Sequence, residues 1–363
     1  MNNGGSRMGR GKYYLLILLI ISITLLIAYM TLTSVPEVPS GKTPEKLTSV
    51  PESSAPSGKT PEKLKIFLAG SLKIPVERIT ELYRKINPNL DFQLEASGSV
   101  EAIKKVTELG KYADLILVAD YGLIPQLMAD HADWYVVFAT NRLVIAYTKS
   151  SKYASEINEN NWHRILMRDG VKFGFSDPNR DPCGYRTVIS FLLASNLSGS
   201  PLASELLSGT NIRVSGMEAW VPDPIQGSEK VVIRPKSVEL LALLESGVLD
   251  YAFEYESVAI QHNLSYVRLP DEINLGNPEL KDFYSRAKVH LGSGEVIEGD
   301  AIAYGLTIPK VAARNDEALK FTKFLLTEGL STFEELGQRV VRPPLAYGKV
   351  PEELKGIVKE VGG

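Results

Sequence analysis

The stretch WYVVFATNRLVIAYT, at residues 134–148, decides how the chain is organised. It is rich in β-branched and aromatic side chains and holds few charges, which is typical of extended chain. We interpret it as a long extended crossover between two folded halves. The stretch DAIAYGLTIP, at residues 300–309, is also extended and serves as the return. Two crossovers between two halves built of strands and helices predict a pair of lobes joined by a hinge.

Strands and helices alternate outward from this crossover. Apolar runs predict strands at residues 65–69, 91–95, 113–119, 142–147, 172–176 and 250–255, and one-sided apolar patterns predict helices at residues 75–85, 184–193 and 237–244. This alternation predicts an α/β fold with a parallel sheet covered by helices on both faces. The last 50 residues are predicted to be helical, because Leu319, Phe321, Phe324 and Leu325 form an apolar stripe.

The two crossovers divide the globular part into two lobes. Residues 65–140 and 302–363 form lobe 1, and residues 141–301 form lobe 2. In open α/β sheets, ligands bind at the carboxyl ends of the strands, where the amino ends of helices also point. The sequence therefore predicts a ligand site in the cleft between the lobes.

A long uncharged segment precedes the globular part. Residues 13–32, YYLLILLIISITLLIAYMTL, follow Arg7, Arg10 and Lys12. About 20 apolar residues cross a bilayer as a helix, and positive charge before them keeps the amino terminus in the cytoplasm. We predict that residues 1–33 are a membrane anchor or an uncleaved signal, with the rest of the chain outside. A cleaved signal peptide is the alternative, although its apolar stretch would be shorter, at about 7–15 residues.

Residues 34–64 form a linker with an internal duplication, because PSGKTPEKL occurs at residues 39–47 and again at 56–64. Its composition cannot bury enough apolar surface to fold, which predicts a disordered spacer. The whole chain has a net charge of −3 and one cysteine, Cys183. This charge shows no basic excess that would indicate nucleic-acid binding, and a lone cysteine excludes an intrachain disulfide.

Several motifs occur in an order that resembles one known family. They are FLAGSL (67–72), EASGSVEAIKKV (95–106), ADLILVADY (113–121), ATNRLVIAY (139–147), FGFSDPNRDPCGYR (173–186) and RPKSVELLALLESGVLDYAFEYESVAIQH (234–262). Together they resemble the archaeal molybdate/tungstate-binding proteins, the solute-binding components of ABC importers. The resemblance covers nearly all of residues 65–345. It implies a type II periplasmic-binding-protein fold with two hinge strands, and binding without catalysis.

The ligand that this resemblance implies dictates the kind of site. Molybdate and tungstate are dianions without a proton at neutral pH, so they only accept hydrogen bonds. Hydroxyls, backbone N–H groups and helix amino ends suit them, and neither lysine nor arginine is required. Gly70 and Ser71 end the first strand, and Ser99 begins the helix after the second strand, with Ser97 as the fallback. A serine at such a place could instead be a plain helix cap.

The segment Asp181-Pro182-Cys183-Gly184 opens a helix of lobe 2. Asp and Pro are common at helix starts, so a purely structural role is the alternative. In the family that the sequence resembles, a carboxylate oxygen at this position approaches the metal itself, which implies a direct contact from Asp181 to Mo or W. Pro182 belongs to the same turn, and the backbone N–H groups of Cys183 and Gly184 would reach the oxyanion.

Two further positions complete the predicted site. The family has a second metal-reaching carboxylate ten residues before the glycine of ESG, where this chain has Ser237. This departure puts six-coordination of the metal in question, because Ser237 would donate a hydroxyl instead. Glu239 lies on another helix face and is the weaker candidate for a second metal contact. Tyr255, at the end of a strand, is expected to donate its hydroxyl to the oxyanion.

The function that follows is extracytoplasmic, high-affinity binding of molybdate or tungstate and delivery to an ABC permease with its ATPase subunit. A receptor for another oxyanion, sulfate or phosphate, is the alternative in the same class. A hydrolase of the same two-lobed shape is disfavoured, because the sequence has no G-x-S-x-G nucleophile elbow, and it has no P-loop for ATP. We expect a monomer at the cell membrane with an extracellular binding domain, no nucleic-acid partner, and no cofactor besides the ligand.

Overall fold

The computed structural model describes residues 62–361. The predicted membrane anchor at residues 1–33, and the linker as far as residue 61, lie outside this part of the chain. Strand β1 (Glu62–Ala69) takes in residues 62–64, which the duplication had assigned to the linker. Within residues 62–361, no helix combines the length and the apolar character that crossing a membrane demands.

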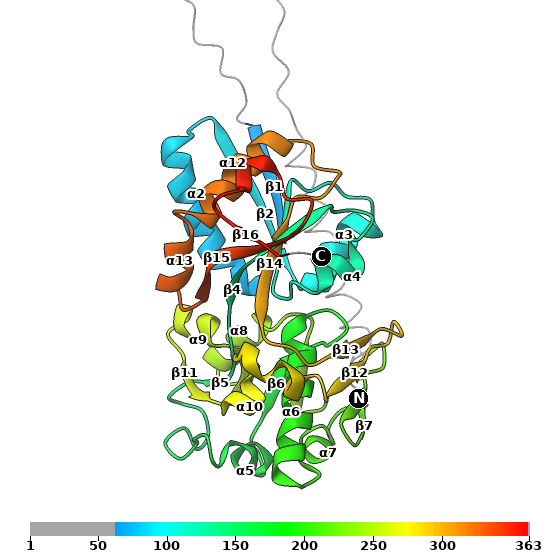
Figure 1. Ribbon diagram of the computed structural model, residues 1–363. Helices are drawn as coiled ribbons and strands as arrows, with labels where there is room; N and C mark the ends of the chain where they lie inside the picture. The colour runs from blue at the N-terminus through cyan, green and yellow to red at the C-terminus, as the bar shows by residue number, and fades with distance from the viewer. Residues whose placement is uncertain (1–61, 362–363) are drawn as a thin grey trace, which may run out of the picture. The chain divides into compact units, whose positions relative to one another are not determined.

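One half of the described chain is built on a seven-stranded sheet, which we call the seven-stranded half. The strand order is β16-β15-β4-β14-β3-β1-β2. Besides β1, its strands are β2 (Leu90–Ser97), β3 (Leu115–Val118), β4 (Trp134–Thr140), β14 (Ala303–Thr307), β15 (Arg339–Gly348) and β16 (Lys359–Glu360). Helices α2 (Lys73–Ile86), α12 (Asn315–Leu326) and α13 (Leu330–Glu335) lie on one face, and α3 (Ser99–Thr107) and α4 (Leu123–Leu127) lie on the other (Figure 1).

Apolar side chains explain why helices cover both faces of this sheet. On one face, Tyr83 of α2 packs edge-on against Phe321 of α12, with ring centroids 5.3 Å apart. On the other face, Phe67 of β1 and Ile103 of α3 are fully buried in a separate cluster. Neighbouring residues of β1 point to opposite faces, so the part that is buried on both faces, residues 66–69, is apolar throughout.

The rest of the described chain forms the five-stranded half, whose sheet has the order β11-β5-β10-β6-β9. Its strands are β5 (Leu143–Tyr147), β6 (Phe173–Ser176), β9 (Val231–Arg234), β10 (Tyr251–Tyr255) and β11 (Ser265–Arg268). One face is covered by α5 (Trp162–Met167), α6 (Pro182–Ser198), α7 (Leu202–Leu206) and α10 (Asp271–Asn274), and the other by α8 (Glu239–Glu245) and α9 (Glu256–Gln261).

A smaller four-stranded sheet, in the order β13-β12-β8-β7, completes the five-stranded half. Its strands are β7 (Arg213–Ser215), β8 (Glu218–Trp220), β12 (Lys288–His290) and β13 (Val296–Glu298). The remaining short helices are η1 (Gly70–Leu72), η2 (Pro278–Leu280), α11 (Lys281–Tyr284) and η3 (Glu352–Leu354).

Both large sheets are mixed, whereas the alternation of strands and helices predicted a parallel sheet. Strands β2 and β3 are parallel to β1, but β14 is antiparallel to both β3 and β4. Strands β9 and β10 are parallel to β6, but β5 is antiparallel to β10. Strands β5 and β14 are the first strands after each crossover; β15, with β16 parallel to it, is also antiparallel to β4. Strands β5 and β14 start at the interface between the halves and run away from it. Strands such as β3 and β10 end at the interface, so they run in the opposite direction.

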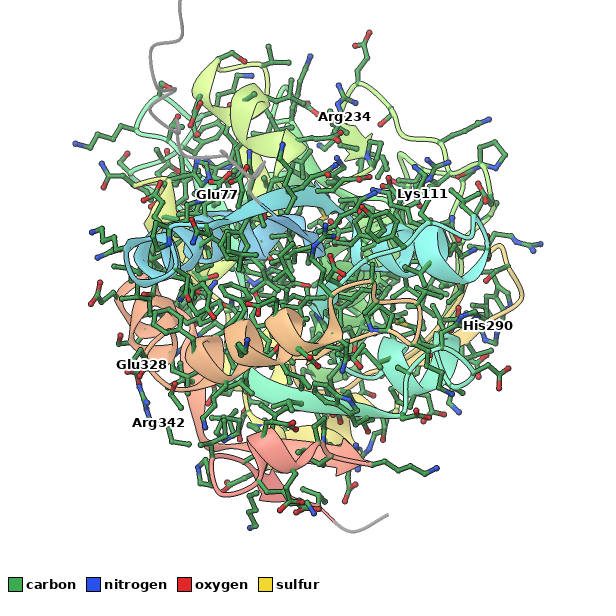
Figure 2. The ribbon with its side chains drawn as sticks, turned by 90° about the horizontal axis from the view of Figure 1, so that it is seen from above. Glu77, Lys111, Arg234, His290, Glu328 and Arg342 are labelled. Carbon is green, nitrogen blue, oxygen red and sulfur yellow. The ribbon has the colours of Figure 1, made fainter. Side chains whose placement is uncertain are left out.

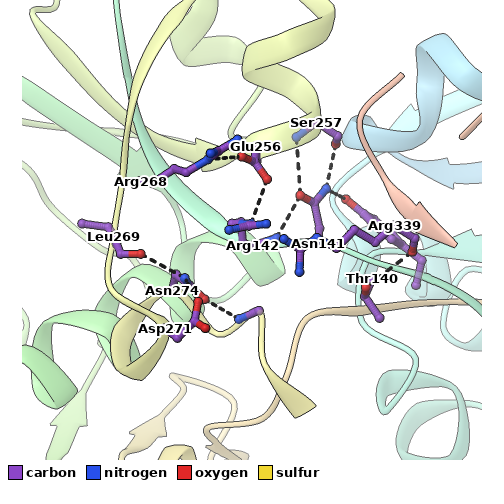
Figure 3. A network of polar contacts seen from close by, with 12 residues as sticks. Thr140, Asn141, Arg142, Glu256, Ser257, Arg268, Leu269, Asp271, Asn274 and Arg339 are labelled. Atoms are coloured by element: carbon purple, nitrogen blue, oxygen red, sulfur yellow. Dashed lines mark hydrogen bonds and ion pairs between the residues drawn. The ribbon is translucent and has the colours of Figure 1, made fainter. Parts of the chain in front are cut away.

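The crossover at residues 134–148 forms two strands, β4 and β5, instead of one continuous strand. They meet at Asn141, whose side chain is buried (Figure 3). Its Nδ2 donates to Ser257 Oγ and to Tyr304 OH, at 2.7 Å each, and its Oδ1 accepts from the N–H of Arg142 at 2.9 Å. Because Tyr304 belongs to β14, the outgoing and returning crossovers are tied together at this one side chain.

The prediction that the last 50 residues are helical is wrong in part. Helices α12 and α13 confirm it as far as Glu335, but strand β15 follows. This strand contains Pro343 and Pro344, and its pairing with β4 changes register between Val340 and Leu345. Proline has no N–H to donate to a neighbouring strand, so an irregularity in the ladder accommodates it. The other predicted strands and helices are confirmed, with shifts of their ends.

Candidate functional site

The carboxyl ends of β1 and β2 bring serine hydroxyls to the interface between the halves. Ser71, in η1, is 5% exposed, and its hydroxyl has no hydrogen-bond partner within residues 62–361. Ser99 begins α3 and is fully buried; its Oγ accepts from the N–H of Ala119 at 2.9 Å, which leaves its proton to donate elsewhere. The hydroxyl of Ser97 already donates its proton to the carbonyl of Gly98 and so has none left for a ligand. The structure therefore favours Ser99 over Ser97 as a donor.

Asp181 caps the amino end of α6 and holds a second loop against it. Its Oδ1 accepts from the N–H of Cys183 at 3.2 Å, and its Oδ2 accepts from the N–H of Ser237 at 2.7 Å. Burial raises the pKa of Asp181, against the lowering effect of these two N–H groups. Pro182 is the first helical residue, where its missing N–H costs no bond. The Cys183 N–H, expected to reach the oxyanion, is bonded to this carboxylate.

The first turn of α6 also lies against the end of β6. A Cβ atom at Gly184 would come within 2.2 Å of the carbonyl oxygen of Ser176, so only glycine permits this approach. The Ser176 side chain is fully buried, and among the described residues its hydroxyl finds no hydrogen-bond partner. A second hydroxyl without a well-formed hydrogen bond thus lies beside the Asp181 cap.

Glu254 of β10 brings another carboxyl group to this region. Its Oε2 accepts from the N–H of Tyr255 at 2.9 Å and from the Cys183 thiol at 3.6 Å. Its Oε1 is buried without a well-formed hydrogen bond in the described part of the chain. Burial raises the pKa of Glu254 to about 8, against the lowering effect of the Ser237 hydroxyl, and the charge of Asp181 adds to the increase. At neutral pH the group is therefore mainly protonated and can donate.

Tyr255 ends β10 and contacts a buried cation. Its hydroxyl accepts from Nη1 of Arg186 at 2.8 Å, and the same Nη1 donates to the carbonyl of Ala119 at 2.6 Å. Within residues 62–361, Arg186 and Lys105 are the buried basic residues, and Lys105 forms an ion pair with Glu95 at 2.7 Å. The structure therefore adds an arginine to a site for which the sequence argument required none.

The two halves approach each other closely around these residues. A Cβ atom at Gly98 would lie 2.1 Å from the carbonyl oxygen of Arg180. Tyr304 of β14 packs edge-on against Tyr255, with ring centroids 6.2 Å apart, and lies beside the Ser71 hydroxyl. Ser71 and Ser99 of the seven-stranded half therefore face the same interface as Asp181, Ser237, Glu254 and Tyr255 of the other half.

Glu239 and the nearby surface cations lie apart from this region. The Glu239 side chain is 39% exposed and lies 3.7 Å from Lys236. Arg234, at the end of β9, is exposed, and its Nη1 donates to the carbonyl of Ile233 at 2.9 Å (labelled in Figure 2). Within residues 62–361, no three His, Cys, Asp or Glu side chains are grouped as a metal-ion site would require. The structure thus brings together every predicted site residue except Glu239. Gly70 lies at the edge of this group, where a Cβ atom would be 3.1 Å from the Val238 side chain.

A family model described as a bacterial extracellular solute-binding protein matches residues 64–339. The chain belongs to this family.

Named relatives of this solute-binding protein are found among the archaea. The molybdate/tungstate-binding protein WtpA of Pyrococcus abyssi is 49% identical over 308 residues, which cover 82% of this chain and 90% of that protein. WtpA of Thermococcus kodakarensis is 47% identical over 308 residues, covering 82% of this chain and 87% of that protein. The resemblance predicted from the sequence motifs is confirmed.

Two solved structures share the fold of the solute-binding protein at low identity. The periplasmic molybdate-binding protein of Azotobacter vinelandii is 15% identical, with a TM-score of 0.54, and covers 77% of this chain and 99% of that one. The sulfate-binding protein SubI of Mycobacterium tuberculosis is 13% identical, with a TM-score of 0.55, and covers 78% and 88%. At such identities the likeness shows the fold alone, which is periplasmic-binding-protein-like.

Two residues of the solute-binding protein's candidate site were not predicted from its sequence. Arg186 lies in the helix segment GYRTVISFLLA, where it is the one charged residue among small and apolar ones. Glu254 interrupts the strand YAFEY in the same way. A single charge inside an otherwise buried element is the signal that could have found both, because such a charge needs a partner or a ligand.

Proposed function

We propose that this solute-binding protein captures molybdate or tungstate between its two halves. The observation that carries the proposal is the set of buried hydroxyls at the interface, those of Ser71, Ser99 and Tyr255, which reach it from both halves. A ligand held there would be enclosed on two sides by donors. The names of the relatives from Pyrococcus abyssi and Thermococcus kodakarensis support the choice of molybdate and tungstate.

The chemistry of these side chains suits an oxyanion that carries no proton. A dianion accepts hydrogen bonds, and hydroxyls supply them without a charge of their own. Arg186 contributes positive charge next to Tyr255. Glu254, with its pKa raised to about 8, is mainly neutral at pH 7 and donates instead of repelling the ligand. The site therefore meets the dianion mainly with neutral donors, since Asp120 balances the charge of Arg186.

We assign the direct contact with the metal to Asp181. Each of its oxygens accepts one N–H hydrogen bond, and each carboxylate oxygen has a second lone pair that remains for the metal. Ser237 has no carboxylate to offer, and Glu239 is turned toward solvent. Glu254 is then the second carboxyl group within the site, and its predominantly protonated state favours hydrogen bonding over metal coordination.

The architecture supports a type II binding protein that closes on its ligand. We propose that residues 65–140 and 302–363 move as lobe 1 and residues 141–301 as lobe 2, with the two crossovers at Asn141 as the hinge. Ligand binding stabilises the closed state because the ligand contacts both lobes only there. Such a protein performs no catalysis.

The wider setting of the protein is part of the same proposal. Residues 13–32 anchor it in the cell membrane, and the linker at residues 34–64 leaves the binding domain outside the cell. The protein acts as a monomer and delivers its oxyanion to an ABC permease driven by an ATPase subunit. The family to which the chain belongs supports an extracellular solute-binding role.

Titration calorimetry on the full chain, purified in detergent, tests the proposal. Tungstate and molybdate should bind tightly, and sulfate and phosphate should not. Asp181→Asn should weaken tungstate binding, because the amide oxygen can still cap α6, whereas the amide nitrogen can neither coordinate the metal nor accept from the Ser237 N–H. Glu239→Gln makes the same chemical change outside the site and should have no effect. Binding of sulfate or phosphate alone, or of no oxyanion, would refute the assignment of the ligand.

A further inference from the structure

Arg186 is a buried cation that reaches from the five-stranded half to the seven-stranded half. Its Nη1 donates to the carbonyl of Ala119, just after β3, at 2.6 Å, and its Nη2 lies 3.1 Å from Oδ2 of Asp120. The Arg186 side chain is 3% exposed. A buried charge without a counter-charge is strongly unfavourable. Asp120, from the opposite half, supplies that counter-charge.

Tyr185 binds the same carboxylate as Arg186 does. Its hydroxyl donates to Oδ2 of Asp120 at 2.5 Å. The other carboxylate oxygen, Oδ1, accepts from the N–H of Gly122 at 3.0 Å, which fixes Asp120 within its own loop. One oxygen of Asp120 thus holds the loop after β3, and the other binds the start of α6.

These interactions depend on the two halves being together, because the donors belong to α6 of one half and the acceptors to the loop after β3 of the other. When the halves separate, Asp120, Tyr185 and Arg186 lose one another as partners and meet water. We propose that these three residues form a latch that holds the closed state and slows release of the bound oxyanion. The inference rests on the proposed function, since it concerns a protein that closes on a ligand.

The latch also orients a residue of the binding site. The Tyr255 oxygen accepts a hydrogen bond from Arg186, so the proton of the same hydroxyl must point elsewhere. A dianion offers it an acceptor. Arg186 is therefore a positioning residue, which turns Tyr255 into a donor toward the ligand while Asp120 balances its charge.

Tyr185→Phe is the substitution that tests the latch. It removes one hydrogen bond between the halves and leaves the charges of Asp120 and Arg186 in place. The matched control is Tyr251→Phe, because Tyr251 is also buried in the five-stranded half, but its hydroxyl donates to the carbonyl of Lys152 within that half. A hydrogen bond to a charged group corresponds to a change of about 10- to 100-fold in an equilibrium.

Release of radioactive tungstate from the full chain, followed on filters after a chase with unlabelled tungstate, gives the first readout. Tyr185→Phe should release tungstate about 10- to 100-fold faster than the wild type, and Tyr251→Phe should release it at the wild-type rate. A rate for Tyr185→Phe equal to that of the wild type overturns the latch, and so does equal acceleration in the two variants.

Hydrogen exchange of the ligand-free full chain gives a readout that does not need the ligand. The latch predicts faster exchange at residues 118–122 and 182–190 in Tyr185→Phe than in either the wild type or Tyr251→Phe. If the wild type retains no tungstate, the proposed function fails, and this comparison alone decides about the latch. Identical exchange in those two segments across the three proteins overturns it.

Discussion

Gly98 offers a way to prevent closure without removing any group that could bind the ligand. A Cβ atom there would lie 2.1 Å from the carbonyl oxygen of Arg180 and 3.0 Å from its carbonyl carbon. Both are backbone atoms of the other half, so neither can turn aside as a side chain could. Gly98 itself has φ −66° and ψ 151°, which alanine adopts without strain. Gly98→Ala should therefore fold normally and fail to close.

The size of the effect follows from the hydrogen bonds that a wider interface would break. Carbon and oxygen atoms need about 3.5 Å, so the halves must separate locally by roughly 1 Å or more. That shift stretches the bond of 2.6 Å from Arg186 to Ala119 and the ion pair of 3.1 Å between Arg186 and Asp120 beyond useful length. Breaking both, at roughly 1–2 kcal/mol each, weakens tungstate binding by about 100-fold.

Calorimetry and thermal unfolding together test this reasoning. Gly98→Ala should show the weaker tungstate binding while the ligand-free protein keeps its melting temperature. Glu101→Ala places the same side chain in the first turn of α3, where Glu101 is partly exposed, and should bind tungstate as the wild type does. A Gly98→Ala variant that binds tungstate with wild-type affinity would show that the liganded halves do not approach as closely as the structure has them.

Three further outcomes are expected. Glu254→Gln should change how stability depends on pH. The raised pKa of Glu254 stabilises the folded wild type fully below about pH 4.5, and this contribution is lost as pH rises through about 8. Denaturant-unfolding curves that respond to pH identically in both proteins would contradict this expectation. Asn141→Ala should lower the free energy of unfolding by roughly 3 kcal/mol, because it leaves two buried hydroxyls without their donor. Asn160→Ala, at an exposed position, should cause no measurable change, and equal values for the two variants would count against the hydrogen bonds of Asn141. Leu325→Ala should cost about 2–5 kcal/mol, and Leu109→Ala, at a side chain 66% exposed, should cost far less in the same chemical-denaturation assay.

Much of the fold could be predicted because apolar patterns are local. The runs that became β1 and β6 are apolar enough to be strands buried on both faces, and α2 shows its apolar stripe plainly. The direction of β5 and β14 could not be predicted in this way, since it depends on which side of a sheet the chain enters. Strand β15 was missed because Pro343 and Pro344 argue against a strand unless an irregular ladder accommodates them.

The candidate site was predicted to the extent that it follows the rule for strand ends. Ser71, Ser99 and Tyr255 all lie where a strand stops at the interface. Arg186 could not be predicted from the chemistry of the ligand, which needs only donors, because its partners Ala119 and Asp120 lie across the interface between the halves. One of the two N–H groups bonded to Asp181 belongs to a loop far away in the sequence, at Ser237. Such a pairing is decided by tertiary packing, which no local pattern contains.

Cys183 is the only thiol of the whole chain, and it is fully buried. Its Sγ lies 3.6 Å from both the Phe253 carbonyl and a Glu254 oxygen, and burial raises its pKa well above the ordinary value, so the reactive thiolate is scarce. The folded protein therefore offers maleimide reagents almost nothing to react with. Cysteines introduced at chosen surface positions could carry a pair of fluorophores in an otherwise native background, and the separation of the two halves could then be measured in single molecules.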